Sequence, residues 1–237
     1  MSSWSAQERL PPALEGCRAC PRLVEHRETV AARKRAAYRD EPYWGRPVPG
    51  FGDPEARLVL LGLAPGAHGS NRTGRQFTGD ASGSVLFPAL HRAGLADRPD
   101  SRTRGDGLRL RGLWITAAVR CAPPGNRPTR DEAARCRPWL IGDLDALPDA
   151  RAVLALGAFA HDAYLETLRA RGAQLVKARH RFGHGEVHRL DRAFPDLDVL
   201  PLVDGYHVSF QNTNTGVLTE PMLDAVLAQA KALAGLA

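Results

Sequence analysis

The chain of 237 residues has no long hydrophobic run and few cysteines, aromatic residues and lysines. No segment is apolar over the roughly 18 residues that a membrane-spanning helix needs. The amino terminus has no basic segment followed by an apolar one, so it does not resemble a secretory signal, and we expect a cytoplasmic protein. Neither GxGxxG nor GK[ST] occurs, which argues against a standard dinucleotide site or P-loop.

The charge balance of the chain is basic. The formal net charge is +6 and the isoelectric point is about 9.5, which favours a polyanionic partner without identifying it. Arginine supplies nearly all of the positive charge, and its guanidinium group suits phosphate contacts. A GC-rich genome would explain the same arginine and alanine content equally well. The hydrophobic content of 43% is enough for a buried core, and we expect one domain over residues 1–237.

Short apolar runs alternate with helical patterns along most of the chain. Four runs are typical of buried strands and predict a mainly parallel sheet with helices on both faces. Ligands bind such sheets at the carboxyl ends of the strands, and three polar loops follow strands there. Thr129 and Glu132 fit a capping box that opens a further helix. The strands are predicted at residues 57–63, 112–119, 151–157 and 198–203, and the loops at 62–83, 116–129 and 207–216.

Four cysteines stand in two distant segments of the chain. Cys17 and Cys20 form a CxxC pair, whereas Cys121 and Cys136 are widely spaced. Stable disulfides are not expected in a reducing cytosol. A metal site with four thiolate ligands, a redox pair and four unrelated buried thiols all remain open. The uneven spacing suits an iron–sulfur cluster better than a zinc ribbon, which usually presents two short knuckles.

Three motifs, taken with the cysteines, resemble the type b (family 5) uracil-DNA glycosylases, in the iron–sulfur branch of that superfamily. The motifs are GLAPGAHGSNRTGRQFTGD at 62–80, CAPPGNRPT at 121–129 and HVSFQNTNTG at 207–216. The resemblance implies an α/β fold with three layers, α/β/α, around a four-stranded, mainly parallel sheet. It also implies removal of deaminated bases from DNA after base flipping, which leaves an abasic site. By the same resemblance a 4Fe-4S cluster would tie an N-terminal arm, residues 1–55, to the core, with Cys17, Cys20, Cys121 and Cys136 as its ligands.

The glycine-rich first motif is the expected base pocket. The resemblance assigns Phe77 to stack on the flipped base, although a phenylalanine here also fits a core position. Family relatives often carry an asparagine at the position of Ala117, where alanine offers uracil no donor or acceptor. We therefore expect a permissive pocket that also accepts hypoxanthine, xanthine or ethenocytosine. The expected pocket comprises Gly62, Ala64, Pro65, Gly66, Phe77 and Ala117.

Asp80 and His207 are the expected catalytic residues. Many sister families place a carboxylate or an amide directly after the first glycine of the first motif, where this chain has Leu63. Asp80 is the nearest replacement, to orient a water or to stabilise positive charge at the sugar, but an aspartate before a helix is also a natural N-cap. His207 would donate to a carbonyl oxygen of the leaving base, which a neutral imidazole can do; the alternative is a structural histidine.

Polar residues of the first and third motifs are the expected DNA contacts. Those of the third motif would contact the minor groove and phosphates and fill the gap left by the extruded base. Those of the first motif could instead hold their own loop together. The histidines of residues 179–188 lack a matching carboxylate or cysteine pattern, which favours a basic DNA-facing loop over a metal site. The expected contacts are His68, Asn71, Arg72, Ser209, Gln211, Asn212 and Asn214.

No lysine in the motifs is placed as a Schiff-base nucleophile, so we expect a monofunctional glycosylase without lyase activity. Leu63 supports an alternative, a cluster-stabilised module that binds uracil or abasic DNA without turnover. A zinc-containing nucleotide-processing enzyme of similar topology is a third possibility. The expected partner is DNA that contains uracil or other damaged bases, and neither a membrane nor an obligate protein partner is expected.

Overall fold

The fold is built on one mixed sheet, seen in a computed structural model that describes residues 12–194, 197 and 199–236. Residues 1–11 of the expected arm lie outside this part. The four predicted strands are confirmed as a parallel group, but two short antiparallel strands extend its edges, so the expected count of four was too low. The order is β1-β3-β2-β4-β6-β5, with β1 at Phe51–Gly52, β2 at Leu58–Gly62, β3 at Leu113–Ala117, β4 at Ala152–Leu156, β5 at Val187–His188 and β6 at Leu202–Gly205.

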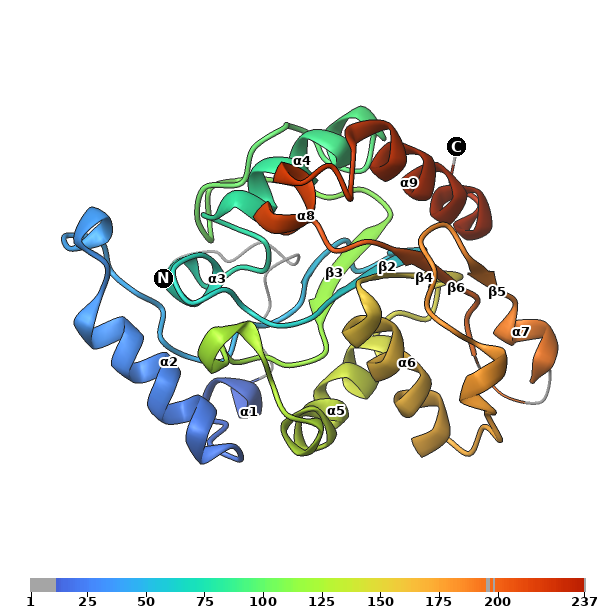
Figure 1. Cartoon of the computed structure of the whole chain (residues 1–237), viewed down its shortest axis with the longest axis horizontal. Helices are drawn as coiled ribbons and strands as arrows, with labels where there is room; N and C mark the ends of the chain where they lie inside the picture. The colour runs from blue at the N-terminus through green and yellow to red at the C-terminus, as the bar shows by residue number, and fades with distance from the viewer. Residues whose placement is uncertain (1–11, 195–196, 198, 237) are drawn as a thin grey trace.

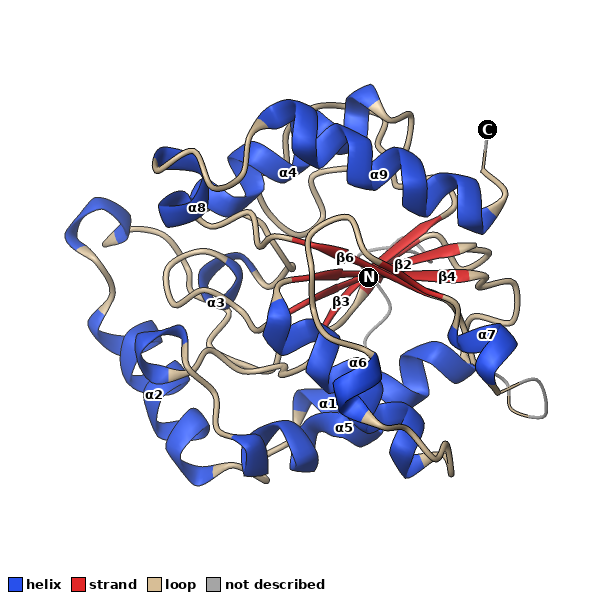
Figure 2. Ribbon diagram, turned by 45° about the vertical axis from the view of Figure 1, so that its right-hand side comes forward, coloured by secondary structure: helices blue, strands red, loops and turns tan. Residues whose placement is uncertain are grey.

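Helices cover both faces of the sheet (Figures 1 and 2), which confirms the expected three layers. Helices α4 and α9 lie over one face, and α5 and α6 lie over the other. Within the described residues, no helix combines the length and apolar character that crossing a bilayer requires. The helices are α1 at Pro12–Glu15, α2 at Pro21–Arg33, α3 at Ser70–Thr73, α4 at Ala81–Arg92, α5 at Arg130–Asp145, α6 at Ala158–Ala170, α7 at Leu190–Ala193, α8 at Phe210–Asn214 and α9 at Glu220–Ala234, with single 3₁₀ turns at Ala36–Tyr38, Pro124–Asn126 and Lys177–Arg179.

The residues of β2 explain why the sheet is buried on both sides. Every residue of this strand is buried, and successive side chains point to opposite faces because a strand has a period of two. Leu58 and Leu60 pack into the hydrophobic layer beneath α4 and α9, whereas Val59 and Leu61 pack into the layer beneath α5 and α6. A central strand with two apolar faces is the pattern of a parallel sheet between helices.

Helix α5 begins as the sequence predicts. The Thr129 hydroxyl accepts from the Glu132 amide at 3.2 Å, and the Glu132 carboxylate accepts from the Thr129 amide at 2.7 Å, which completes the capping box. The same carboxylate accepts two bonds from Arg22 of α2, at 2.8 and 2.6 Å. One side chain therefore caps α5 and links it to α2. Helix α2 itself ends at Arg33, because Lys34 takes a left-handed backbone with φ 54°.

Strand β6 differs from its prediction of 198–203. Asp198 lies outside the described residues. Leu200 donates its amide to the Tyr164 hydroxyl at 3.0 Å, and Pro201 has no amide to donate, so neither extends the ladder on its N–H side. The strand instead runs to Gly205 and includes Asp204, a fully buried carboxylate. A charged residue in a central strand was not anticipated from the sequence.

Candidate active site

A cavity of about 590 Å³ opens at the carboxyl ends of β2, β3 and β6. It is lined by residues from the three loops that follow these strands, as the sequence predicts. Of the predicted site residues, Gly62, Ala64, Gly66, Phe77, Asp80, Ala117, His207, Ser209 and Gln211 line it. The chain therefore brings both expected catalytic residues and most of the expected pocket together.

The ring of Phe77 forms one wall of the cavity. It lies 6.1 Å from the ring of His207, centroid to centroid, with 33° between the planes. Phe77 has φ 52°, a left-handed backbone that is uncommon outside glycine and asparagine. Two glycines make room for it. A β-carbon at Gly62 would lie 2.7 Å from Cζ of the ring, and one at Gly83 would collide with the Phe77 carbonyl oxygen.

An ion pair braces the loop that carries Phe77. The Arg75 guanidinium, 1% exposed, binds both oxygens of Asp106 at 2.8 and 2.6 Å. Arg75 also donates to the hydroxyl of Ser101 at 2.7 Å, and Ser101 in turn contacts the Thr78 hydroxyl at 2.6 Å. Phe77 therefore stands between two residues that are fixed to the loop of residues 98–108.

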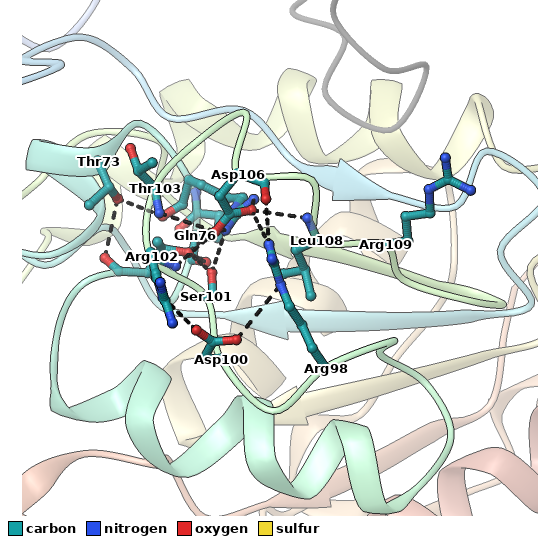
Figure 3. Close-up of polar contacts among 12 residues, drawn as sticks. Thr73, Gln76, Arg98, Asp100, Ser101, Arg102, Thr103, Asp106, Leu108 and Arg109 are labelled. Carbon is teal, nitrogen blue, oxygen red and sulfur yellow. Dashed lines mark hydrogen bonds and ion pairs between the residues drawn. The ribbon is translucent and has the colours of Figure 1, made fainter.

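Asp106 is the centre of this brace (Figure 3), where Arg98 and the Leu108 amide also reach its carboxylate. Burial alone would raise the pKa of Asp106, but the bonds from Arg75 and from backbone amides outweigh it and hold that pKa well below its usual range. Asp106 thus stays ionised in the folded protein throughout the neutral range.

Asp80 is the N-cap of α4, and only one of its two carboxylate oxygens takes part in the cap. Its Oδ1 accepts from the amides of Ser82 and Gly83 at 3.1 and 3.2 Å, so the capping alternative is correct. Its Oδ2 faces the glycine-rich loop, 2.8 Å from where a β-carbon of Gly66 would lie, and accepts no hydrogen bond from the described residues. Burial raises the pKa of Asp80, with the two cap bonds and Arg72 opposing the shift.

His207 follows β6 and projects its ring toward Phe77. Asn212 donates to the His207 carbonyl at 2.8 Å and so fixes its backbone. Neither ring nitrogen bonds to any described residue, which leaves both for a ligand. Burial lowers the pKa of His207, because an imidazolium would lose its hydration there. The ring is therefore neutral at pH 7.

One predicted pocket residue and five predicted DNA contacts lie outside the cavity lining: Pro65, and His68, Asn71, Arg72, Asn212 and Asn214. The Asn71 amide donates to the Arg27 carbonyl at 3.2 Å, and His68 meets the Tyr43 hydroxyl at 2.9 Å. The Arg72 guanidinium donates to the carbonyls of His68 and Gly79 at 2.8 Å each. These bonds match the alternative that first-motif side chains hold their own loop, and a DNA contact by them stays a prediction.

The lining residues that were not predicted from the sequence include Gln76, Arg127 and Phe210. Gln76 is 1% exposed and donates to the Val48 carbonyl at 3.2 Å, so its amide is fixed beside Phe77. Phe210 opens α8 and is 66% exposed, which is unusual for a large apolar side chain. Its place within the third motif was a usable signal. Arg127 stands in the second motif, in which only Cys121 had an expected site role.

The four cysteines line one small cavity of about 20 Å³ between α1, α2 and the start of α5. Arg27 donates to Sγ of Cys121 at 2.8 Å, and the Arg120 amide donates to Sγ of Cys136 at 3.2 Å. Without a metal, burial raises the pKa of the Cys136 thiol to about 12. Donors that point at sulfur are the surroundings of a thiolate ligand. However, no three of the four sulfur atoms lie within 4.8 Å of one another, a distance that would suit a single metal ion.

Another group of side chains does meet this distance. It consists of His161, His188 and Asp204, whose ligand atoms all lie within 4.8 Å of one another, and it is the one such group in the described residues. Residues 179–188 contain no carboxylate in a metal-ligand spacing with their histidines, but β6 supplies one, Asp204. A further histidine, His161, comes from α6. The three histidines of that segment are half-buried, whereas Arg179 and Arg181 beside them are exposed, so a DNA-facing role of this basic loop stays a prediction.

Comparisons with known proteins agree with this geometry. The family model for the uracil DNA glycosylase superfamily matches residues 49–231. The chain is 54% identical over 230 residues to a type-5 uracil-DNA glycosylase of Thermus thermophilus, covering 97% of this chain and 99% of that protein. It is 52% identical to one of Mycobacterium bovis, covering 93% and 79%, and 47% identical to one of Pyrobaculum aerophilum, covering 94% and 91%.

Proposed function

Since this chain belongs to the uracil DNA glycosylase superfamily, we propose that it removes uracil from DNA by hydrolysing the bond between the base and C1′ of the deoxyribose. The observation that carries the proposal is the meeting of Phe77, Asp80 and His207 at one cavity. The cavity is large enough for a nucleobase turned out of the helix, since small-ligand sites begin at about 300 Å³.

Phe77 and His207 act on the base. The phenyl face stacks on the flipped uracil, and the strained backbone of Phe77 keeps that face turned into the cavity. As the glycosidic bond breaks, its electron pair goes to the base, which leaves as an anion. A neutral His207 donates a hydrogen bond to a carbonyl oxygen where that charge develops. Burial supports this role because it keeps the ring neutral.

Asp80 acts on the sugar. Its Oδ1 is fixed by two backbone amides, so Oδ2 has one orientation toward the cavity. There an ionised carboxylate stabilises the positive charge that develops at C1′ and orients the water whose oxygen forms the new bond. Capping and catalysis are therefore compatible, one oxygen serving each. The water's proton is released to solvent, directly or through Asp80.

The rim of the cavity binds the DNA duplex. Phe210 is exposed on the loop after His207, where it can occupy the space that the extruded base leaves. Ser209, Gln211 and Asn214 offer polar groups to the phosphates beside it, and Arg127 adds a positive charge at the opposite rim. Contacts from His68, Asn71 and Arg72 would require these side chains to leave the bonds that they make now.

The pocket accepts more than uracil. Ala117 lines the cavity and provides no donor or acceptor for the base edge, so it does not reject a base with a different edge. Hypoxanthine, xanthine and ethenocytosine are the proposed additional substrates. No catalytic lysine is assigned, so the product is an abasic site without strand cleavage.

A 4Fe-4S cluster at the four cysteines is part of the proposal. The residues fit it: four thiols from two distant segments of the chain line one cavity, and Arg27 and the Arg120 amide point at two of the sulfurs. A multinuclear cluster stands between its ligands, so it suits sulfurs that are more widely placed than those of a single-ion site. When bound, the cluster would link α1 and α2 to α5 as one structural unit, and the whole chain would form one domain.

One assay separates turnover from mere binding. A duplex with a single uracil is incubated with the protein and treated with alkali, which breaks the strand only where the base was removed. Strand breaks at the uracil support excision. Retention of the duplex in a gel without breaks supports the alternative, a uracil-binding module, which Leu63 at the usual carboxylate position favours. Repeating the assay with the other three bases tests the permissive pocket, and activity confined to uracil would contradict it.

A further inference from the structure

Three side chains with metal-binding chemistry meet away from the active-site cavity. His161 comes from α6, His188 from β5 and Asp204 from β6, and none of the three lines the active-site cavity. Asp204 is fully buried, His161 is 2% exposed and the His188 side chain is 9% exposed. Buried charged and imidazole groups in such proximity need either compensating protons or a metal ion.

The hydrogen bonds of His161 show where its protons lie. Its Nε2 faces the carbonyl oxygen of His180 at 2.9 Å, and a carbonyl only accepts, so this nitrogen carries a hydrogen. In a neutral imidazole Nδ1 then has a lone pair. That lone pair faces Oδ1 of Asp204 at 2.8 Å, and the carboxylate oxygen also only accepts. Two acceptors at this distance require a cation between them.

The other side of the carboxylate repeats the pattern. Oδ2 of Asp204 lies 3.0 Å from Nε2 of His188 and accepts from the Gly183 amide at 3.2 Å. A backbone carbonyl on the far nitrogen of His161 and an amide on the carboxylate are the partners that orient histidine and aspartate ligands in metal sites. Both partners belong to the segment 180–188, which also supplies the ligand His188, so this one segment contributes to the orientation of all three ligands.

We infer that His161 Nδ1, His188 Nε2 and the Asp204 carboxylate bind a Zn²⁺ ion. Two imidazoles and one carboxylate are a common protein ligand set for zinc, which completes its tetrahedron with one further ligand. The ion takes the place of the proton between His161 and Asp204. It has no part in base excision. Its effect is to hold residues 180–188 against β6 at Asp204, which lies three residues before His207.

The test uses the full-length protein with the metals it carries from expression. Elemental analysis is expected to find about one zinc per chain, separate from any iron. Zinc X-ray absorption is expected to show only nitrogen and oxygen neighbours, at about 2.0–2.2 Å, whereas zinc on the cysteines would show sulfur at about 2.3 Å. Absence of zinc, or a sulfur neighbour, would overturn the assignment and leave a protonated His161 as the cation.

Substitutions sharpen the result. His188→Ala and Asp204→Asn should both lose the zinc and keep the iron content of the wild type. His180→Ala is the matched control, because the backbone carbonyl that His161 needs is retained and the His180 ring is no ligand, so its zinc content should not change. Circular dichroism identifies a variant that does not fold. The zinc X-ray absorption spectrum of the wild-type protein tests the ligand set without any variant. Equal zinc content in His188→Ala and the wild type contradicts the site.

Discussion

The ring of Phe77 lies 6.1 Å from that of His207, although the two residues follow different strands and belong to different motifs. This relationship fixes the width of the proposed base site, and it depends on Gly62, against which the Phe77 ring packs. Changes that move one ring without touching the polar groups therefore test the site most directly.

Gly62→Ala should reduce excision sharply. The added methyl group would lie 2.7 Å from Cζ of Phe77 and push the ring into the cavity. A displacement of about 1 Å in a positioning group can lower a rate by roughly 10²-fold, and we expect a loss of that order in single-turnover assays. Gly142→Ala is the control, because this glycine lies within α5 with open space around it, and there alanine should stabilise the helix by about 0.5–1 kcal/mol with unchanged excision. Equal rates for both variants would refute the role given to the ring.

Asp80→Asn separates capping from catalysis. Asparagine is as good an N-cap as aspartate, so the melting temperature should change little. The amide carries no charge to stabilise a cation at C1′, and the single-turnover rate should fall by about 10²-fold or more. Asp80→Ala should in addition lose about 1 kcal/mol of stability through the missing cap. Normal excision by the asparagine variant would reduce Asp80 to a cap alone.

The pH profile of excision should show a step from Asp80 and none from His207. Burial raises the pKa of Asp80, so the charge is lost at a higher pH than for an ordinary carboxyl, and the rate should fall as the pH drops through that raised value. Burial lowers the pKa of His207, so the imidazole stays neutral through pH 6.5 and should add no step there. Single-turnover rates across the acid range check this. The acid limb should be absent from Asp80→Asn, and a step at pH 6.5 would count against a buried His207.

Asp106→Asn should destabilise the protein. The change leaves the buried Arg75 guanidinium without its carboxylate, and breaking a buried ion pair typically costs about 3–5 kcal/mol. Because the pKa of Asp106 is depressed on folding, its contribution is present above pH 3.8 and is lost as the pH falls below that value. Chemical denaturation measures both effects. Asp100→Asn serves as the comparison, since its pairs with the 82% exposed Arg102 and the 33% exposed Arg98 should each be worth less than about 1 kcal/mol.

Cys136→Ser should abolish the visible absorption of the proposed cluster. Cys136 lines the cysteine cavity from α5, and a serine hydroxyl is a much poorer ligand for iron than a thiolate. Iron analysis of anaerobically purified protein checks the result. Full iron content in the variant would show that the cluster, if any, is held elsewhere.

The sequence predicted the parts of this molecule that depend on local pattern. Strand β2 is apolar throughout and α5 opens with a capping box, and each appears where expected. The site could be located because parallel strands bring their following loops together. The dual use proposed for Asp80 could not be foreseen, because it depends on which carboxylate oxygen faces the amides.

Groups of residues that are distant in the sequence and meet only in the fold could not be predicted either. His161 and Asp204 join His188 only after α6 and β6 have packed, and neither residue stands in a recognisable ligand spacing. The short edge strands β1 and β5 each have two residues, too few for any alternation to be visible in the sequence. Residues 36–38 continue the helical pattern of α2, but the left-handed Lys34 ends the helix first.

The double use of Glu132, as cap of α5 and partner of Arg22, ties two local structures to one side chain. Cys20 directly precedes α2 and Cys136 lies on α5, so this carboxylate also joins the two helices nearest the cysteines. A change at Glu132 would therefore affect three features together: the start of α5, the packing of α2 and the spacing of the sulfurs.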